Sequence, residues 1–217
     1  MFAVYAAEPN PQDPLASLRI GDRPDPELPE EHVAVTVAAA SLNMHDLWTL
    51  RGVGIKREQF PMILGCDGAG VLADGSEVVI YPVITSPGWT GDETLDPRRT
   101  LLTEKLQGSF AEIVVVPDRN VVPKPASLTF PEAACMGTAW LTAYRMLFVK
   151  SGLRAGQTML VQGASGGVST ALVQLGRSTG MRVWVTGRTE DKRELARSLG
   201  AHQVFESGAR LPERVDA

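Results

Sequence analysis

The segment Gly163-Ala-Ser-Gly166-Gly167-Val168 has the clearest chemical potential in this chain. It follows an apolar run, Thr158–Gln162, and it precedes a stretch whose apolar residues recur at helical spacing. A glycine turn between a strand and a helix lets a pyrophosphate approach the backbone, and the helix N-terminus offers free N–H groups. A tight turn without a ligand is the alternative. The pattern predicts a dinucleotide site made by Gly163, Ala164, Ser165, Gly166, Gly167 and Val168.

The residues after the next apolar run, Arg182–Thr186, favour one nicotinamide coenzyme over the other. An NAD site needs a carboxylate about 20 residues past the first glycine, whereas the 2′-phosphate of NADPH needs cations there. This chain has Gly187 and Arg188 at that point, and Lys192 follows one helical turn later. We therefore expect all three residues to contact NADPH. The alternative is that Arg188 and Lys192 are solvated charges at a helix start.

These residues belong to a region in which helix and strand patterns alternate. Residues 131–147 form a helical run, and the pattern then alternates as strand, helix, strand, helix, strand, with the strands at 158–162, 182–186 and 203–205. Gly180 and Gly200 stand where the two helices should end. This order predicts a parallel sheet with helices packed on its faces.

Residues 1–124 have a different pattern, which is typical of a small barrel or sandwich. Short runs rich in Val and Ile are separated by Pro, Gly and Asp clusters. Residues 87–107 contain few apolar side chains in any period and are expected to form a surface loop. The predicted strands are Phe2–Tyr5, Val33–Ala39, Glu77–Tyr81 and Phe110–Val116. The chain is thus expected to be an α/β protein with domains at 1–124 and 125–217.

Composition excludes several classes of protein. The net charge of −4 and the absence of a long basic run argue against a nucleic-acid partner. No apolar stretch approaches the roughly 20 residues that a membrane helix needs, and the first residues do not look like a secretory signal, so we expect a cytoplasmic protein with no membrane partner. Two cysteines cannot build a four-cysteine zinc site.

Several motifs occur in an order that resembles the medium-chain dehydrogenase/reductase superfamily. They are Ala39–Leu47, Gly65–Gly70 (GCDGAG), Gly108–Glu112, Ala139–Tyr144 and the glycine turn with the segment that follows it. Within that superfamily the chain is similar to the zinc-independent, quinone-oxidoreductase-like branch. The resemblance implies a GroES-like β-rich catalytic domain, then a Rossmann doubly wound parallel sheet, with the active site between them.

The resemblance also implies roles for particular residues. Asn43 matches the family's asparagine near the nicotinamide, where its amide is expected to donate a hydrogen bond, and Asp46 is expected to support that loop. Thr138 and Thr142 match positions on the nicotinamide side, although helix carbonyls are alternative partners for these hydroxyls. Many relatives have Tyr where this chain has Met44. His45 or a water is then a candidate proton donor, or His45 is only a local hydrogen-bond partner.

Zinc-dependent relatives bind their catalytic metal at positions that match Asn43, Cys66 and Thr138, and only Cys66 is a strong zinc ligand. We therefore expect no metal, and Cys66 to be a small buried residue. The implied reaction is hydride transfer from NADPH to a small quinone or an α,β-unsaturated carbonyl. The alternatives are a zinc-dependent alcohol dehydrogenase and an NADPH-binding protein without turnover.

The Rossmann pattern is incomplete. A sheet in the order 3-2-1-4-5-6 needs six strands, and about three precede the last residue. Residues 210–217 resemble the approach to a fourth strand, so we expect a C-terminally truncated domain, and a homodimer for the full-length protein.

Overall fold

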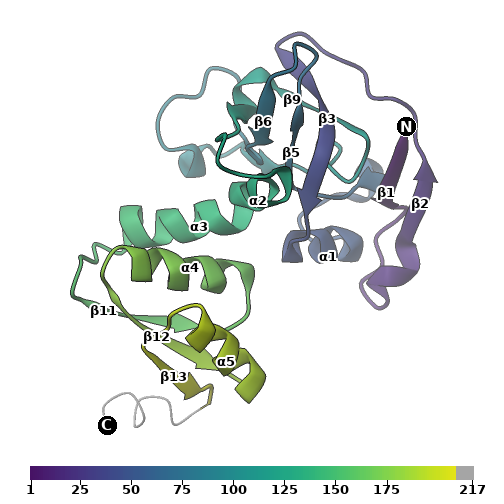
Figure 1. Cartoon of the computed structure of the whole chain (residues 1–217). Helices are drawn as coiled ribbons and strands as arrows, with labels where there is room; N and C mark the ends of the chain where they lie inside the picture. Colours follow the sequence, from purple (N-terminus) through teal and green to yellow (C-terminus); the bar gives the residue numbers. More distant parts are fainter. Residues whose placement is uncertain (209–217) are drawn as a thin grey trace. The chain divides into compact units, whose positions relative to one another are not determined.

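The computed structural model describes residues 1–208 and divides into two compact units, Met1–Thr138 and one that begins at Ala139 (Figure 1). The first unit includes α2 (Phe130–Ala134), which packs on its main sheet. Ala133 and Ala134 of α2 share a small buried cluster with two sheet residues. Residues 210–217, which resemble the approach to a fourth strand, lie outside the described residues.

The first unit is built on antiparallel sheets. The main one has the order β10-β6-β5-β3-β9, a smaller one has the order β2-β1-β4, and β7 pairs with β8. The strands are β1 (Phe2–Ala6), β2 (Leu18–Asp22), β3 (His32–Ser41), β4 (Met62–Ile63), β5 (Asp67–Val71), β6 (Glu77–Ile80), β7 (Val83–Ile84), β8 (Thr100–Leu101), β9 (Ile113–Pro117) and β10 (Val121–Pro123). Short 3-10 turns are η1 (Pro14–Ser17), η2 (Arg57–Gln59), η3 (Glu93–Leu95) and η4 (Asp118–Asn120). All four strands expected from the sequence are present, with bounds shifted by up to three residues.

The central strand β5 was not predicted, because its sequence DGAGV is poor in β-formers. Packing explains the glycines. A Cβ on Gly70 would lie 2.1 Å from the carbonyl oxygen of Thr36, and one on Gly68 would lie 2.9 Å from Cδ1 of Ile80. The neighbouring strand and side chains therefore approach the backbone more closely than any side chain permits.

The expectation that residues 87–107 form only a surface loop is wrong for the second half of that segment. It contains β8, and Leu102 is fully buried in the apolar core beneath the main sheet. Asp96 is also buried, where it accepts hydrogen bonds from the backbone N–H groups of Ser86 and Arg98 at 2.6 and 2.8 Å. A buried carboxylate that satisfies loop amides gives no periodic signal in a sequence.

Helix α1 (Met44–Arg51) begins directly after Asn43, and the sequence patterns did not predict a helix there. Asp46 at the third helical position accepts a hydrogen bond from the Asn43 backbone N–H at 2.8 Å, and Gly52 ends the helix with φ of 78°. Both are ordinary start and stop signals, and they were readable in the sequence.

The second unit contains the predicted parallel sheet, in the order β11-β12-β13. Its strands are β11 (Thr158–Gln162), β12 (Arg182–Gly187) and β13 (Gln203–Glu206). Its helices are α3 (Leu141–Tyr144), α4 (Gly167–Ser178) and α5 (Glu190–Ser198), with π-helical turns η5 (Met136–Trp140), which spans the unit boundary, and η6 (Arg145–Lys150). The alternation and the helical run from Pro131 are confirmed. No helix in residues 1–208 is long and apolar enough to cross a membrane.

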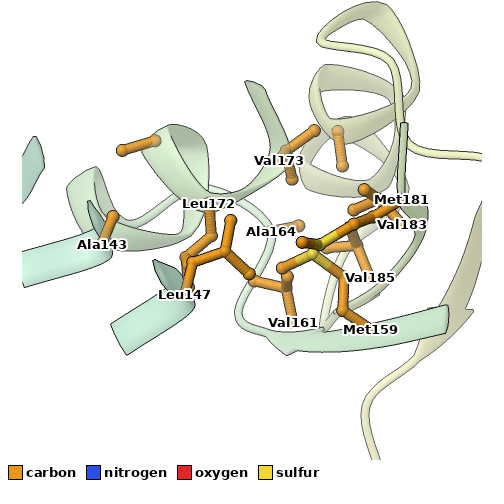
Figure 2. Close-up of a cluster of buried hydrophobic side chains, with 12 residues drawn as sticks. Ala143, Leu147, Met159, Val161, Ala164, Leu172, Val173, Met181, Val183 and Val185 are labelled. Atoms are coloured by element: carbon orange, nitrogen blue, oxygen red, sulfur yellow. The ribbon is translucent and has the colours of Figure 1, made fainter. Parts of the chain in front are cut away.

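Helices α4 and α5 pack into one core with the sheet, which Figure 2 shows in close-up. Met159 and Val161 of β11 point into this core, whereas Leu160 between them is 42% exposed. Within the described residues, helices therefore cover one face of β11 rather than both. Gly176 of α4 packs closely against β11 and β12. A Cβ at this position would lie 2.6 Å from Sδ of Met159 and 2.9 Å from Cγ2 of Val183.

Replacing Gly176 with alanine is expected to destabilise the protein by about 1–2 kcal/mol, because the overpacking outweighs the roughly 1 kcal/mol that alanine gains in helix propensity. Urea denaturation monitored by circular dichroism measures this difference. An exposed helix glycine would show the opposite sign, so a gain in stability would contradict the close packing of α4 on β11 and β12.

Candidate functional site

A cavity of about 580 Å³ lies at the carboxyl ends of the parallel strands in the second unit. This is the place where open parallel sheets bind their ligands. Its lining residues are Gln162, Gly163, Ala164, Ser165, Gly166, Thr186, Gly187, Arg188, Lys192, Ser207 and Gly208. Seven of the predicted coenzyme-binding residues line this cavity, namely Gly163, Ala164, Ser165, Gly166, Gly187, Arg188 and Lys192. Gly167 and Val168 lie in the first turn of α4 and are not among the lining residues.

Each glycine of the turn has its own physical reason. Gly163 has φ of 92°, a conformation that side chains disfavour, and its N–H donates to the Thr186 carbonyl at 3.1 Å. A Cβ on Gly166 would meet protein no closer than Ser169 Oγ at 3.6 Å, so this side of the turn is open to a ligand. A Cβ on Gly167 would lie 3.2 Å from Cβ of Ala139, so this glycine serves packing.

Ser169 stands where the usual glycine pattern has glycine or alanine, and the structure accounts for it. The hydroxyl of Ser169 donates to the Gln162 carbonyl at the end of β11, at 3.3 Å. The close helix–strand contact that the sequence pattern assigns to this position is made instead at Gly176, about two turns later in α4.

Two cations flank the cavity. Arg188 is exposed and Lys192 is half-buried, and neither makes an ion pair or hydrogen bond with another described residue. Gly187 is buried beside them: a Cβ there would lie 3.0 Å from both Cβ of Ala164 and Cγ of Arg193. An acidic side chain at 187, of the kind that binds the ribose of NAD, would therefore require its neighbours to move.

Sequence reasoning missed four residues of this cavity, Gln162, Thr186, Ser207 and Gly208. Gln162 and Thr186 end their strands, so the carboxyl-end rule could have found them. Ser207 and Gly208 follow β13, and only the pairing of that strand brings them to the cavity. The Ser207 N–H donates to the Gly187 carbonyl at 3.2 Å.

The first unit holds a second polar cluster, centred on the fully buried carboxylate of Asp67. Three side chains donate to it: Ser41 Oγ at 2.9 Å, Asn43 Nδ2 at 2.9 Å and Thr138 Oγ1 at 2.5 Å. Burial raises the pKa of Asp67, although these three donors act in the opposite direction. We call these four residues the Asp67 cluster. Asp67 lies in the GCDGAG motif, but its role as an acceptor depends on contacts up to 71 residues apart.

Asp46 links the start of α1 to the loop before β5. One oxygen of its carboxylate accepts from the Asn43 N–H, and the other accepts from the Gly65 N–H, both at 2.8 Å. Burial is the main cause that raises the pKa of Asp46. Both oxygens are engaged by the backbone, so Asp46 positions Asn43 relative to Gly65.

The donor set around Asp67 does not fit zinc. Asn43 and Thr138 offer an amide and a hydroxyl that already donate to Asp67, and neither is a common zinc ligand. Cys66 is buried, as expected, with Sγ 3.5 Å from Thr138 Oγ1, and desolvation raises its thiol pKa to about 12. Among residues 1–208 no three His, Cys, Asp or Glu side chains are placed to share a metal ion.

The remaining predicted residues are found in different surroundings. Thr142 is exposed on α3, and its hydroxyl makes no hydrogen bond with another described residue. His45 is 8% exposed and packs edge-on against Trp48, while its Nε2 has no partner within the described part of the chain. The two interpretations of His45, as a proton donor and as a local hydrogen-bond partner, remain predictions. Met44 is 59% exposed.

Comparison with known proteins gives the same picture of the fold. Residues 29–126 match the model of the alcohol dehydrogenase GroES-like domain. Crotonyl-CoA reductase from Streptomyces collinus is 31% identical over 96% of this chain and 54% of its own length. The chain spans about half the length of the curated relatives it matches.

Two solved structures are similar over nearly the whole chain. One is described as an NAD-dependent alcohol dehydrogenase, with a TM-score of 0.89 and 35% identity over 99% of this chain and 66% of the other. The second is the quinone oxidoreductase from Thermus thermophilus, described together with its complex with NADPH, with a TM-score of 0.74 and 30% identity over 100% of this chain and 63% of the other. The glycine turn, the β-rich first unit and these likenesses agree, and the chain belongs to the medium-chain dehydrogenase/reductase superfamily.

Proposed function

We propose that this chain is part of an NADPH-dependent oxidoreductase of the zinc-independent, quinone-oxidoreductase-like branch, which reduces quinones or α,β-unsaturated carbonyl compounds. The observation that carries the proposal is the glycine-turn cavity with Arg188 and Lys192 unpaired beside it among the described residues. Relatives named for quinone and for crotonyl-CoA reduction support the choice of substrate class. A cytoplasmic homodimer, and the domain division at residue 124, remain predictions.

The residues present fit the coenzyme. The Gly163–Gly166 turn and the start of α4 would hold the pyrophosphate, and Arg188 and Lys192 would pair with the ribose phosphate. When bound, NADPH supplies a hydride. The similar structure described as NAD-dependent makes NADH the necessary comparison in any binding experiment.

The Asp67 cluster supports reduction without a metal. One N–H of the Asn43 amide donates to Asp67, and the other contacts of its Nδ2 in the described chain are long, at 3.4 Å to Ser41 Oγ and 3.5 Å to the Ser41 carbonyl oxygen. The second N–H could therefore be offered to a substrate or coenzyme oxygen. Quinones and enones are already electron-poor, so they accept a hydride at carbon without a Lewis acid, and water can supply the proton that completes the reduction. In this account Asn43 orients a reactant. Asp46 and Asp67 keep Asn43 in place, and Thr138 donates to the same Asp67 carboxylate.

The test uses the full-length protein. Fluorescence titration with NADPH and NADH should give tighter binding of NADPH, and a panel of quinones and enones should include compounds that cause NADPH absorbance to fall. Tight binding without oxidation by any member would favour a binding protein without turnover. One zinc per chain by metal analysis, with alcohol oxidation, would favour the zinc alcohol dehydrogenase. Equal affinity for both coenzymes would contradict the roles of Arg188 and Lys192.

A further inference from the structure

We infer that Arg193 is a specificity-determining residue, which makes the cavity selective for a 2′-phosphate by holding the Glu190 carboxylate away from it. The inference rests on the proposed function, since it concerns how the same cavity discriminates NADPH from NADH. Arg193 does not line the cavity itself. It acts through Glu190 and Gly187, and it is therefore a positioning residue.

Glu190 is the first residue of α5, between the two cations that flank the cavity. The positive end of the helix dipole stabilises an acidic side chain at a helix N-terminus. A bound phosphate would be stabilised most at the same place. A free carboxylate here would repel the phosphate and would compete for Arg188 and Lys192. A site that selects a phosphate therefore has to neutralise this carboxylate or turn it away.

The structure shows how Glu190 is neutralised. Arg193 donates to Glu190 Oε2 from Nε at 3.0 Å and from Nη2 at 2.6 Å, and Arg197 donates to Oε1 at 2.7 Å. Arg197 also pairs with Glu194 at 2.7 Å. Hydrogen bonds from Arg197 and Arg193 lower the pKa of Glu190, so it is ionised and its charge is compensated within the helix. Both oxygens point to cations that do not line the cavity.

Arg193 also connects this ion pair to the cavity wall. Its Nη1 donates to the Gly187 carbonyl at 2.8 Å, and the same carbonyl accepts from the Ser207 N–H at 3.2 Å. Its side chain is 16% exposed, much less than the 43% of Arg197. The guanidinium is thus held in one place by two acceptors, and the carboxylate of Glu190 is held with it. Lysine could not make these parallel contacts.

Replacing Arg193 with glutamine should free Glu190 Oε2 to turn toward the cavity, while Arg197 still binds Oε1. We expect the dissociation constant for NADPH to rise about fivefold, because a carboxylate repels a phosphate through water over a few ångströms. The dissociation constant for NADH should change less than about twofold. The double variant with Arg193→Gln and Glu190→Gln should return to within about twofold of wild type, because the repelling charge is gone.

Asp191 provides the matched control. It is exposed, it makes no ion pair with another described residue, and it does not line the cavity. Adding Asp191→Asn to the Arg193→Gln variant changes net charge by the same amount as Glu190→Gln and should not restore NADPH binding. Restoration by both changes would show a general charge effect and would overturn the inference.

Binding is measured on the full-length protein by titration with each coenzyme, with thermal melting to verify that each variant is folded. One contrary outcome is that the Arg193→Gln variant loses affinity for NADPH and NADH equally, without rescue by Glu190→Gln. That result would mean that Arg193 only supports the cavity wall at Gly187, and it would overturn the inference. An unchanged ratio of affinities would do the same. If the wild type binds neither coenzyme, the proposed function fails instead, so the two failures are distinguishable.

Discussion

Replacing Arg188 and Lys192 together with alanine is expected to raise the dissociation constant for NADPH about 100-fold and that for NADH less than about threefold. Each cation is expected to make one charge-assisted contact with the 2′-phosphate, and such contacts contribute about 1.5 kcal/mol each. NADH lacks this phosphate, so the affinity of the protein for NADH should change little. Isothermal titration of the full-length protein with both coenzymes measures the two constants.

A charge-matched control separates this contact from the general field of the protein. Arg51 and Lys105 are exposed cations of the first unit, and neither pairs with another described residue. Replacing both with alanine removes the same net charge and should change NADPH affinity less than about twofold. If this control weakens NADPH binding as much as the cavity variant does, the two cavity cations have no specific role.

The second large effect concerns stability. Replacing Asp67 with alanine is expected to lower the free energy of unfolding by about 3 kcal/mol, because Ser41, Asn43 and Thr138 each lose their acceptor in a poorly solvated site. Asp67→Asn keeps the size and one acceptor oxygen, and it should cost about 1 kcal/mol. Urea denaturation gives both values. A loss below about 1 kcal/mol for the alanine variant would show that the cluster contributes little.

The pH dependence of this comparison has a definite sign. Burial raises the pKa of Asp67 above its ordinary value of 3.8, so the folded protein keeps this proton after the unfolded chain has released it. The stabilisation from the protonated form is complete below pH 3.8 and is lost as pH rises through the folded-state pKa. The stability of wild type relative to Asp67→Asn should therefore fall as the pH increases from about 4. Asp46 is present in both proteins, and its charge is one of the causes that raise the pKa of Asp67. A rise over the same range would contradict the buried position of the carboxyl.

The glycine-turn cavity was largely predictable because its parts are local in the sequence. A strand, a glycine turn and a helix follow one another from Thr158 to Ser178, and Gly187 to Lys192 come directly after the next strand. Carboxyl ends of neighbouring parallel strands meet at one edge, so local patterns were sufficient to predict seven of the lining residues. Arg193 was not predicted, because a cation that pairs with Glu190 and one that faces a ligand look the same in a sequence.

The Asp67 cluster shows the opposite case. The family resemblance pointed to Asn43, Cys66 and Thr138 one by one, but the group that joins Asn43 and Thr138 is Asp67, across separations of 24 and 71 residues. Its strand, β5, was missed because glycines that permit close approach of backbones also weaken any β pattern.

The sequence alone therefore determined the superfamily, the parallel and antiparallel halves, and the edge of the parallel sheet at which the glycine-turn cavity lies. Only the tertiary structure decided which charges near that site are free and which are paired among the described residues, and which carboxylate organises the polar cluster of the first unit. The reason is physical: periodicity and turn chemistry are properties of neighbouring residues, whereas the satisfaction of a buried or charged group depends on partners that folding brings from elsewhere.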